Sequence, residues 1–223
     1  NVDQCELDIP LAFESNVSTA LNLRLAAEIC ESKIIHISTN DVFDGKTGMY
    51  TEEDLTNPIN FYAKSKQMAE YVFHEYERSL ILRLTFLSWT ASSKQTFVAW
   101  IAENLTKGKA VQLFEDQFNS PLYIKTVVRW VEQLFEAEGI LHLGSKRHSR
   151  YETGLHIAQA LKAQVKQDID LELVVARSIN DVNLGASRPL DVSLNCQKAA
   201  RVWHLSTSLD QEIQALIRDC PML

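Results

Sequence analysis

The sequence predicts an α/β fold built on a parallel sheet with helices on both faces. Short apolar runs rich in β-branched residues, typical of buried parallel strands, recur along the chain. They alternate with amphipathic stretches long enough for helices, and this alternation is the pattern of βαβ units. The length of 223 residues allows one large domain, or one domain with a small lobe.

The first helix and the first strand have clear patterns. Pro10 opens a stretch in which apolar residues recur every four positions, so one helical face stays apolar to about Cys30. The run Lys33-Ile34-Ile35-His36-Ile37-Ser38 then predicts a buried strand. Small polar residues follow where this strand leaves the carboxyl edge of the sheet: Ser38, Thr39, Asn40 and Asp41.

The remaining elements follow in the same alternation. Turn residues at 44–48 and an irregular loop through Asn57-Pro58 precede a helix from Asn60 to about Tyr76. Further strands are expected at 79–84, 110–114, 139–143 and near 171–175. Further helices are expected at about 95–107, 123–137, 150–163 and 208–219.

Glycine usage bears on nucleotide binding. The chain has seven glycines and contains neither G-x-G-x-x-G nor G-x-x-G-x-x-G, although the phosphate turn of a dinucleotide-binding fold needs two or three glycines. The first residues are neither a signal peptide nor a usual initiation site. We therefore expect the chain to begin partway through a domain whose glycine turn lies upstream.

Composition argues against several classes of partner. The net charge is -7, and the 22 basic residues are scattered, so nucleic acid and anionic membranes are not expected to bind. No apolar run approaches the roughly 18 residues that a transmembrane helix needs. The four cysteines are far apart and form no C-x-x-C pair, so we expect no metal site, no disulfide framework and a cytoplasmic location.

Tyr62 and Lys66 form a Y-x-x-x-K pattern on the helix expected after Asn60. Residues four apart share one helical face, about one turn from each other. An adjacent ammonium favours the phenolate and lowers the tyrosine pKa from its usual value of about 10. The pair can therefore protonate a carbonyl oxygen while a hydride reaches the carbon, and Lys66 can also bind the ribose of a nicotinamide cofactor. The ordinary alternative is a solvated helix face, since this spacing is common by chance.

Thr39 adds a third group to this pair. It stands at the mouth of the buried strand that ends near Ser38, where a hydroxyl can donate to the same oxygen as the tyrosine. A strand, a polar exit, a proline-containing loop, and then Tyr and Lys on the next helix form a specific arrangement. This context favours a catalytic triad over a solvated face.

Several segments together resemble one family, the dTDP-4-dehydrorhamnose reductases, which are extended short-chain dehydrogenase/reductases. Residues 37–45 and 50–66 resemble the family's I-S-T-D-Y-V-F-D-G, Y-x-E-x-D and Y-G-x-[ST]-K motifs. Residues 116–121 resemble D-Q-x-G-x-P, and 187–198 resemble R-P followed by L-D-x-x-K. The family's first motifs, V-D-x-x-E and N-V, are resembled by Val2-Asp3 with Glu6 and by Asn16-Val17. Each motif is weak alone, but they run in family order over nearly the whole chain.

The resemblance implies a role for each matching residue. It implies that Thr39, Tyr62 and Lys66 are catalytic, and that Ser38, Tyr62, Lys66 and Thr85 contact a cofactor, NADP or NAD. It also implies that a 4-keto nucleotide sugar is reduced. The residues expected to contact this substrate are Val2, Asn40, Asp41, Phe86, Gln117 and Arg188. Arg188 suits a diphosphate because guanidinium binds phosphate oxygens bidentately; the ordinary alternative is a surface ion pair.

The resemblance also implies an architecture. Residues 1–115 would form the later part of a Rossmann-like sheet, incomplete at the N-terminus, to which some later segments return. Residues 116–223 would form mainly a smaller, substrate-binding lobe. A homodimer is an open expectation for the assembly.

Departures from the family motifs leave the substrate open. The family's T-D-Y is Thr39-Asn40-Asp41 here, so a carboxylate replaces an aromatic residue, and Phe86 stands at the position of a tryptophan. Two other functions also stay open on the same fold. One is a non-catalytic subunit such as the regulatory β subunit of methionine adenosyltransferase. The other is an epimerase or dehydratase, which would need further acid-base groups.

Overall fold

A computed structural model of the chain describes residues 2–89, 95–164 and 169–220. Its largest sheet has three parallel strands in the order β1 (Ile34–Ile37), β2 (Ser79–Arg83) and β7 (Gly139–His142). Ile34 pairs with Ser79, and Leu80 pairs with Gly139. The strands expected at 33–38 and 79–84 are therefore confirmed as parallel neighbours, and the strand expected at 139–143 joins them. The first of these is less buried than its apolar run predicts, because none of the four residues of β1 is fully buried and Ile37 is exposed.

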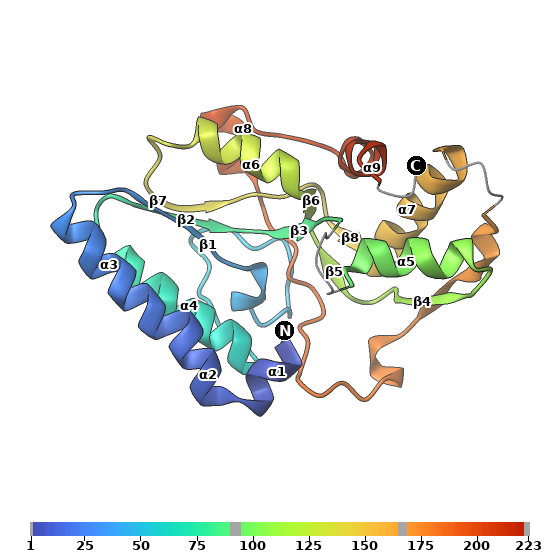
Figure 1. Cartoon of the computed structure of the whole chain (residues 1–223), viewed down its shortest axis with the longest axis horizontal. Helices are drawn as coiled ribbons and strands as arrows, with labels where there is room; N and C mark the ends of the chain where they lie inside the picture. Colours follow the sequence, from blue (N-terminus) through green and yellow to red (C-terminus); the bar gives the residue numbers. More distant parts are fainter. Residues whose placement is uncertain (1, 90–94, 165–168, 221–223) are drawn as a thin grey trace.

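Helices cover both faces of this sheet, as the alternation predicted (Figure 1). On one face, α3 (Thr19–Ile29) and α4 (Phe61–His74) pack through Ala20, Ala69 and Phe73 against Ile81. On the other face, α6 (Ile124–Gln133) and α8 (Gln197–Trp203) pack through Val127, Trp130 and Ala199 against Leu80 and Leu82. All five residues of β2 are buried, which explains its unbroken apolar character.

Helix α4 begins where the sequence predicts it. The side chain of Asn60 accepts a hydrogen bond from the backbone N–H of Ala63 at 2.9 Å, which satisfies one of the free N–H groups of the first turn. The helix buries Ala63, Ala69 and Phe73. Tyr62 and Lys66 therefore lie on its first two turns, close to the end of β1.

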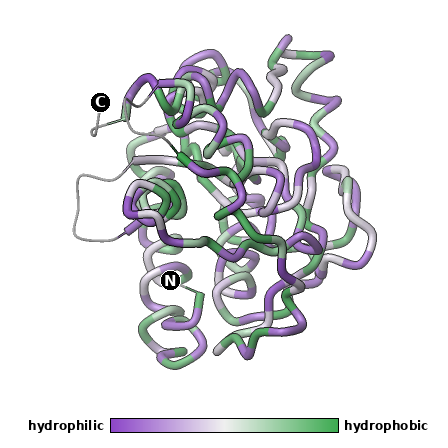
Figure 2. The backbone as a smooth tube through the Cα atoms, turned by 90° about the vertical axis from the view of Figure 1, so that its right-hand side faces the viewer, coloured by the Kyte–Doolittle hydropathy of each residue, from purple (hydrophilic) through white to green (hydrophobic). Residues whose placement is uncertain are grey.

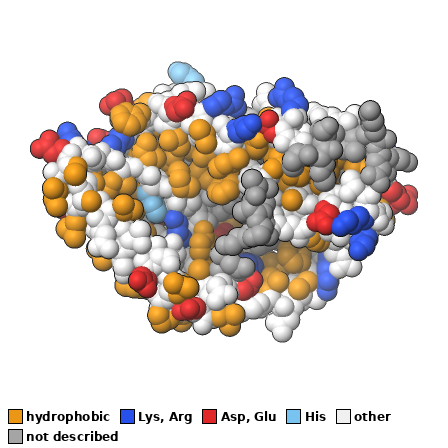
Figure 3. All heavy atoms as spheres, viewed as in Figure 1, with side chains coloured by type: hydrophobic (Ala, Val, Ile, Leu, Met, Phe, Trp, Pro, Cys, Tyr) orange, Lys and Arg blue, Asp and Glu red, His pale blue; other side chains and the backbone are white. Residues whose placement is uncertain are grey.

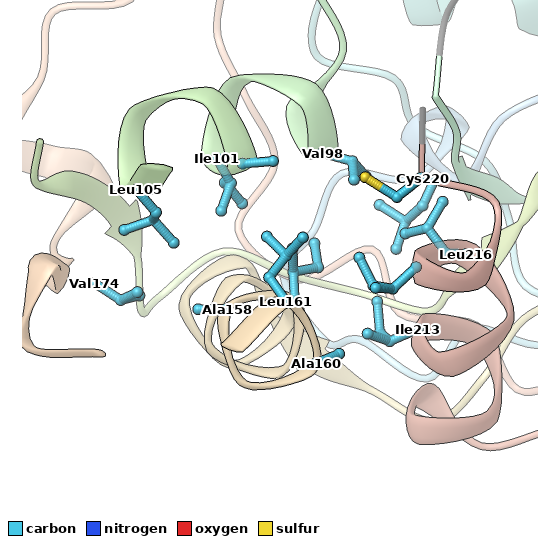
Figure 4. Packing of buried hydrophobic residues seen from close by; sticks show 14 of the residues in the cluster. Val98, Ile101, Leu105, Ala158, Ala160, Leu161, Val174, Ile213, Leu216 and Cys220 are labelled. Atoms are coloured by element: carbon cyan, nitrogen blue, oxygen red, sulfur yellow. The ribbon is translucent and has the colours of Figure 1, made fainter. Parts of the chain in front are cut away.

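A second apolar core lies beside the three-stranded sheet. It is formed by α5 (Phe97–Thr106), α7 (Arg150–Gln164) and α9 (Leu209–Arg218), with the parallel pair β4 (Val111–Phe114) and β9 (Val174–Arg177). Figure 4 shows Ile101 and Leu105 of α5 pointing toward Ala158 and Leu161 of α7. Two smaller pairs complete the strands: β3 (Thr85–Leu87) with β6 (Pro121–Tyr123), parallel, and β5 (Phe118–Asn119) with β8 (His148–Ser149), antiparallel.

Several boundaries differ from the sequence-based expectation. The strand expected near 171–175 begins only at Val174, because residues Leu171–Leu173 form a 3-10 turn that the side chain of Asp170 caps. Tyr123 belongs to β6 rather than to the following helix, since it pairs with Leu87. The helix expected at 123–137 ends earlier, at Gln133.

The N-terminal helical stretch is also more divided than expected. It consists of α1 (Val2–Leu7), α2 (Ile9–Phe13), a π-helical turn (Glu14–Ser18) and α3. Figure 2 shows hydrophilic and hydrophobic residues alternating along the helices, as expected of helices with one buried face. Along α2 and α3, however, several apolar side chains remain exposed: Ile9, Leu11, Phe13, Leu21, Leu23, Leu25 and Ile29. Hydrophobic side chains are visible on the surface in this region, at the left of Figure 3.

Candidate active site

The candidate site begins at the carboxyl end of β1, where the backbone turns into a short 3-10 segment, Asn40–Val42. Thr39 caps this segment, and its hydroxyl accepts a hydrogen bond from the backbone N–H of Asp41 at 3.2 Å. Asn40 is buried beneath it and accepts a hydrogen bond from the Thr85 hydroxyl at 2.8 Å. The Asn40 amide also donates to the carbonyl of Val192 at 3.2 Å. Asn40 thus ties together three segments that are distant in the sequence.

Tyr62 and Lys66 of α4 also lie at the carboxyl end of β1. The side chain of Tyr62 lies within interaction reach of the Thr39 side chain, which acts to lower the pKa of Tyr62. The Lys66 ammonium donates to the carbonyl of Ile37 at 2.8 Å and lies 3.2 Å from Nε2 of His36. Because an ammonium can only donate, His36 Nε2 accepts here. The pKa of His36 is lowered to about 3, mainly by burial and then by Lys66, so this imidazole stays neutral.

The electrostatics of Tyr62 differ from the sequence-based expectation. Its pKa is raised to about 12, first by burial and then by the carboxylate of Asp41, while the Thr39 side chain acts in the opposite direction. Burial also lowers the pKa of Lys66. We expected Lys66 to lower the pKa of Tyr62, but its ammonium is directed to the carbonyl of Ile37. In this state the tyrosine is therefore firmly protonated.

A buried polar network lies next to the triad and connects β1, α4 and β2. Ser38 donates a hydrogen bond to Glu70, which lies one turn after Lys66 on α4. Arg83 of β2 donates to both carboxylate oxygens of Glu70, at 2.7 Å from Nη2 and 3.1 Å from Nε. All three side chains are buried. The hydroxyl of Ser38 is thus used inside the protein, and a contact between Ser38 and a cofactor stays a prediction.

A cavity of about 180 Å³ lies next to the triad: Asp41, two residues after Thr39, lines it, whereas Thr39, Tyr62 and Lys66 are not among its lining residues. Its walls include five of the six residues expected to contact substrate, namely Val2, Asp41, Phe86, Gln117 and Arg188. Thr85, expected at the cofactor, also lines it. The sixth residue, Asn40, does not line the cavity. It is buried and forms hydrogen bonds with Thr85 and Val192. The structure therefore brings together residues that the sequence places in five separate segments.

The cavity also contains residues that the sequence did not single out. These are Leu87, Phe97, Phe118, Asn119, Pro121, Arg150, Thr153 and Val192. Arg150 has the clearest chemistry, because its Nε is buried and has no hydrogen-bond partner among the described residues. Its guanidinium carbon lies 5.0 Å from the centroid of the Phe97 ring. In the sequence Arg150 ends the basic stretch 146–150, which resembles an ordinary charged surface segment, so no signal marked it.

The described residues contain no group of three or more His, Cys, Asp or Glu side chains that could hold a metal ion. Within the same residues, no helix combines the length and apolar character that a membrane span requires.

Comparison with known proteins identifies the family. A family model described as the RmlD substrate binding domain matches residues 1–220. The chain belongs to the RmlD substrate-binding-domain family. The resemblance to dTDP-4-dehydrorhamnose reductases that the motifs indicated is thereby confirmed.

Three relatives illustrate the range of this family. The dTDP-4-dehydrorhamnose reductase of Aggregatibacter actinomycetemcomitans is 30% identical over 220 residues, which cover 93% of this chain and 74% of that protein. Methionine adenosyltransferase 2 subunit beta of Danio rerio is 27% identical over 206 residues, 85% of this chain and 62% of that protein. The crystal structure of dTDP-4-dehydrorhamnose reductase from Bacillus anthracis in complex with NADP has a TM-score of 0.86 at 22% identity, covering 99% of this chain and 77% of that one.

The similarity to the Bacillus anthracis crystal structure shows that this chain shares the α/β fold of that reductase. The chain spans between 52% and 74% of the length of the first curated relatives it matches.

Proposed function

We propose that this protein is a reductase of 4-keto nucleotide sugars that uses NADPH or NADH. The observation that carries the proposal is the meeting of Thr39, Tyr62 and Lys66 at the carboxyl end of β1, beside a polar cavity. The side chains of Thr39 and Tyr62 lie within interaction reach of each other, so both hydroxyls can bind one substrate oxygen.

Each residue of the triad has a role in this reaction. When bound, a reduced nicotinamide supplies the hydride that attacks the keto carbon. Tyr62 gives its proton to the carbonyl oxygen, so the ketone becomes an alcohol, and Thr39 donates a second hydrogen bond to the same oxygen. The raised pKa of Tyr62, about 12, keeps the proton in place until the oxygen becomes basic. The Lys66 ammonium has three N–H donors, so it can keep its hydrogen bond to the carbonyl of Ile37 while another N–H binds the nicotinamide ribose.

The residues present fit one end of a dinucleotide. Ligands of open parallel sheets bind at the carboxyl ends of the strands, where Lys66 and Thr85 lie. The chain has no glycine-rich phosphate turn of its own. We propose that β1, β2 and β7 are the later strands of a Rossmann-like sheet, and that the exposed apolar side chains of α3 face its remaining part. The α5, α7 and α9 core then forms the substrate-binding lobe.

The cavity fits the polar substrate of such an enzyme. Its walls carry hydroxyl, amide, carboxylate and guanidinium groups beside the aromatic rings of Phe86, Phe97 and Phe118. Arg188 is the expected partner of the diphosphate, although here it forms an ion pair with Asp3 at 2.9 Å. Because Asp41 and Phe86 depart from the family motif, we expect weak activity on the dTDP-rhamnose precursor and better activity on another keto sugar.

The proposal is tested by following the oxidation of NADPH and NADH spectrophotometrically with a panel of 4-keto nucleotide sugars. We expect at least one member of the panel to be reduced to the alcohol, with one cofactor oxidised per alcohol formed. Identifying the product by mass spectrometry separates reduction from slow cofactor decay. If the natural protein binds the cofactor but reduces no member of a broad panel, the reductase proposal fails.

A non-catalytic subunit is the second candidate function. It is favoured by the similarity to methionine adenosyltransferase 2 subunit beta, since identity to that protein is close to identity to the reductase. In that case the cavity would bind a ligand without turnover, and the protein would change the activity of a partner enzyme instead. Copurification of a stoichiometric partner enzyme, together with an inactive panel assay, would support it.

An epimerase or dehydratase is less favoured by the cavity. Such enzymes need an acid-base group besides the tyrosine. Among the described residues that line the cavity, Asp41 is the only carboxylate, and there is no His or Cys. The lining therefore offers a single candidate for this second acid-base group. A change at a second sugar carbon, seen in the products of the panel assay, would support this candidate over the reductase.

A further inference from the structure

The cavity beside the triad has one carboxylate and two guanidinium groups on its walls: Asp41, Arg150 and Arg188. Asp41 follows Thr39 by two residues, and its charge acts on Tyr62. Arg150 is the first residue of α7 and comes from the second core. The charged groups therefore reach the cavity from two different parts of the fold.

The two arginines differ in how far the protein satisfies them. Arg188 forms an ion pair with Asp3 at 2.9 Å and donates to the carbonyl of Ala186 at 2.9 Å. Arg150 packs over the Phe97 ring, and its buried Nε has no hydrogen-bond partner among the described residues. Stacking on an aromatic ring covers the flat face of a guanidinium but leaves the N–H groups at its edge unbonded. A buried N–H without an acceptor is costly, so this edge is suited to an acceptor that a ligand supplies.

Asp41 is the complementary group. Its carboxylate interacts with Arg150 and Arg188 through space as charges, and burial raises its pKa in spite of both arginines. A carboxylate accepts hydrogen bonds and cannot stack on a sugar ring, as an aromatic residue in this position would. Asp41 therefore favours a ligand that presents a hydroxyl next to the reacting carbon.

We propose that Asp41 and Arg150 are specificity-determining residues that hold the nucleotide sugar at two points. Arg150 binds an anionic oxygen of the ligand, and Asp41 accepts a hydrogen bond from a sugar hydroxyl. The anionic oxygen belongs either to the diphosphate or to a carboxylate on the sugar. The inference rests on the proposed nucleotide-sugar site, and it does not require that the sugar is reduced.

Calorimetric binding of thymidine diphosphate and of thymidine tests the role of Arg150. In the natural protein, Arg150→Met should weaken binding of thymidine diphosphate by about tenfold or more, the usual scale for a lost charge-assisted hydrogen bond, and leave thymidine unaffected. Arg201→Met is the matched control, because Arg201 is exposed on α8 and away from the cavity lining. Equal thermal unfolding midpoints for the variants exclude misfolding as the cause.

A second pair of ligands separates the two sources of the anionic oxygen. If thymidine diphosphate binds the Arg150→Met protein normally, but a preference for UDP-glucuronate over UDP-glucose is lost, Arg150 binds a sugar carboxylate. If both the diphosphate affinity and this preference are the same in Arg150→Met and in wild type, the proposed role of Arg150 is overturned.

The role of Asp41 is tested by comparing ligands with and without the sugar. Asp41→Asn should weaken binding of dTDP-glucose relative to thymidine diphosphate by about fivefold or more, since only the former carries sugar hydroxyls. An unchanged ratio between the two affinities would overturn this part of the proposal. All these measurements follow binding without turnover, so their failure is distinguishable from failure of the reductase proposal.

Discussion

At the scale of single residues, the decisive question is which group sets the protonation of Tyr62. The sequence places a lysine one turn away and so predicts a lowered pKa. The structure instead places Asp41 within electrostatic reach, and burial and this carboxylate raise the tyrosine pKa to about 12. Proton donation to a carbonyl oxygen needs the protonated phenol, so Asp41 helps to keep Tyr62 in the form that can donate.

This predicts an effect of Asp41 on the pH dependence of reduction. Activity should fall as the pH rises through the pKa of Tyr62, because the phenol then loses its proton. Asp41→Asn removes a negative charge that raises this pKa, so the alkaline limb of the kcat/KM profile should move to lower pH. The pH profile of reduction measures the shift, and Asp181→Asn, an exposed position away from the cavity lining, is the control. An alkaline limb that stays in place or moves to higher pH would contradict the assignment.

The triad could be expected from the sequence, but its surroundings could not. Thr39 follows a strong strand signal, and Tyr62 and Lys66 share one helical face, so local patterns suffice to bring them together. Arg150 comes within electrostatic reach of Asp41 only through the packing of α7, and no local pattern in the sequence indicates this. The direction of the Lys66 ammonium depends on a side-chain rotamer and on His36, which sequence periodicity does not determine.

At the scale of elements, the buried ion pair between Glu70 and Arg83 joins α4 to β2. It holds the helix that carries Tyr62 and Lys66 against the strand next to β1. Both side chains are at most 5% exposed, and Ser38 donates to the same carboxylate. Removing one member of such a pair leaves the other charge buried and uncompensated.

Glu70→Gln should therefore lower the free energy of unfolding by about 3–5 kcal/mol. Glu103→Gln removes the carboxylate of an exposed ion pair with Lys107 on α5 and should leave the unfolding midpoint nearly unchanged. Urea denaturation followed by circular dichroism measures both. Equal midpoints for Glu70→Gln and Glu103→Gln would show that the buried network does not stabilise α4.

The elements with strong apolar patterns could be predicted with nearly correct bounds. These are β1 and β2, which are short continuous apolar runs, and α4, whose buried residues recur at helical spacing. The strands β3, β5, β6 and β8 have only two or three residues, so they carry no period of their own. Their pairing depends on tertiary contacts, such as that of Leu87 with Tyr123. The 3-10 turn at Leu171–Leu173 likewise depends on a cap by Asp170 rather than on apolar spacing.

At the scale of the whole molecule, the fold places the cavity where two apolar cores meet. Asp41 and Thr85 follow strands of the main sheet, whereas Phe97 and Arg150 belong to helices of the second core. The sequence predicts the parallel sheet and its two helical layers, because alternation of strands and helices is a property of the chain itself. It does not predict that β4 and β9 pair apart from the main sheet, since that choice depends on how α5 and α7 pack.

The most direct test of the catalytic account compares two tyrosines of the same helix. Tyr62 lies half-buried beside Thr39, whereas Tyr71 is 60% exposed on α4. In the natural protein, with a keto sugar that it reduces, Tyr62→Phe should lower turnover by at least about 10²-fold, the usual scale for a positioned acid. The cofactor affinity should change little, and Tyr71→Phe should leave turnover nearly unchanged. Turnover in the Tyr62→Phe protein equal to that of Tyr71→Phe would contradict the account.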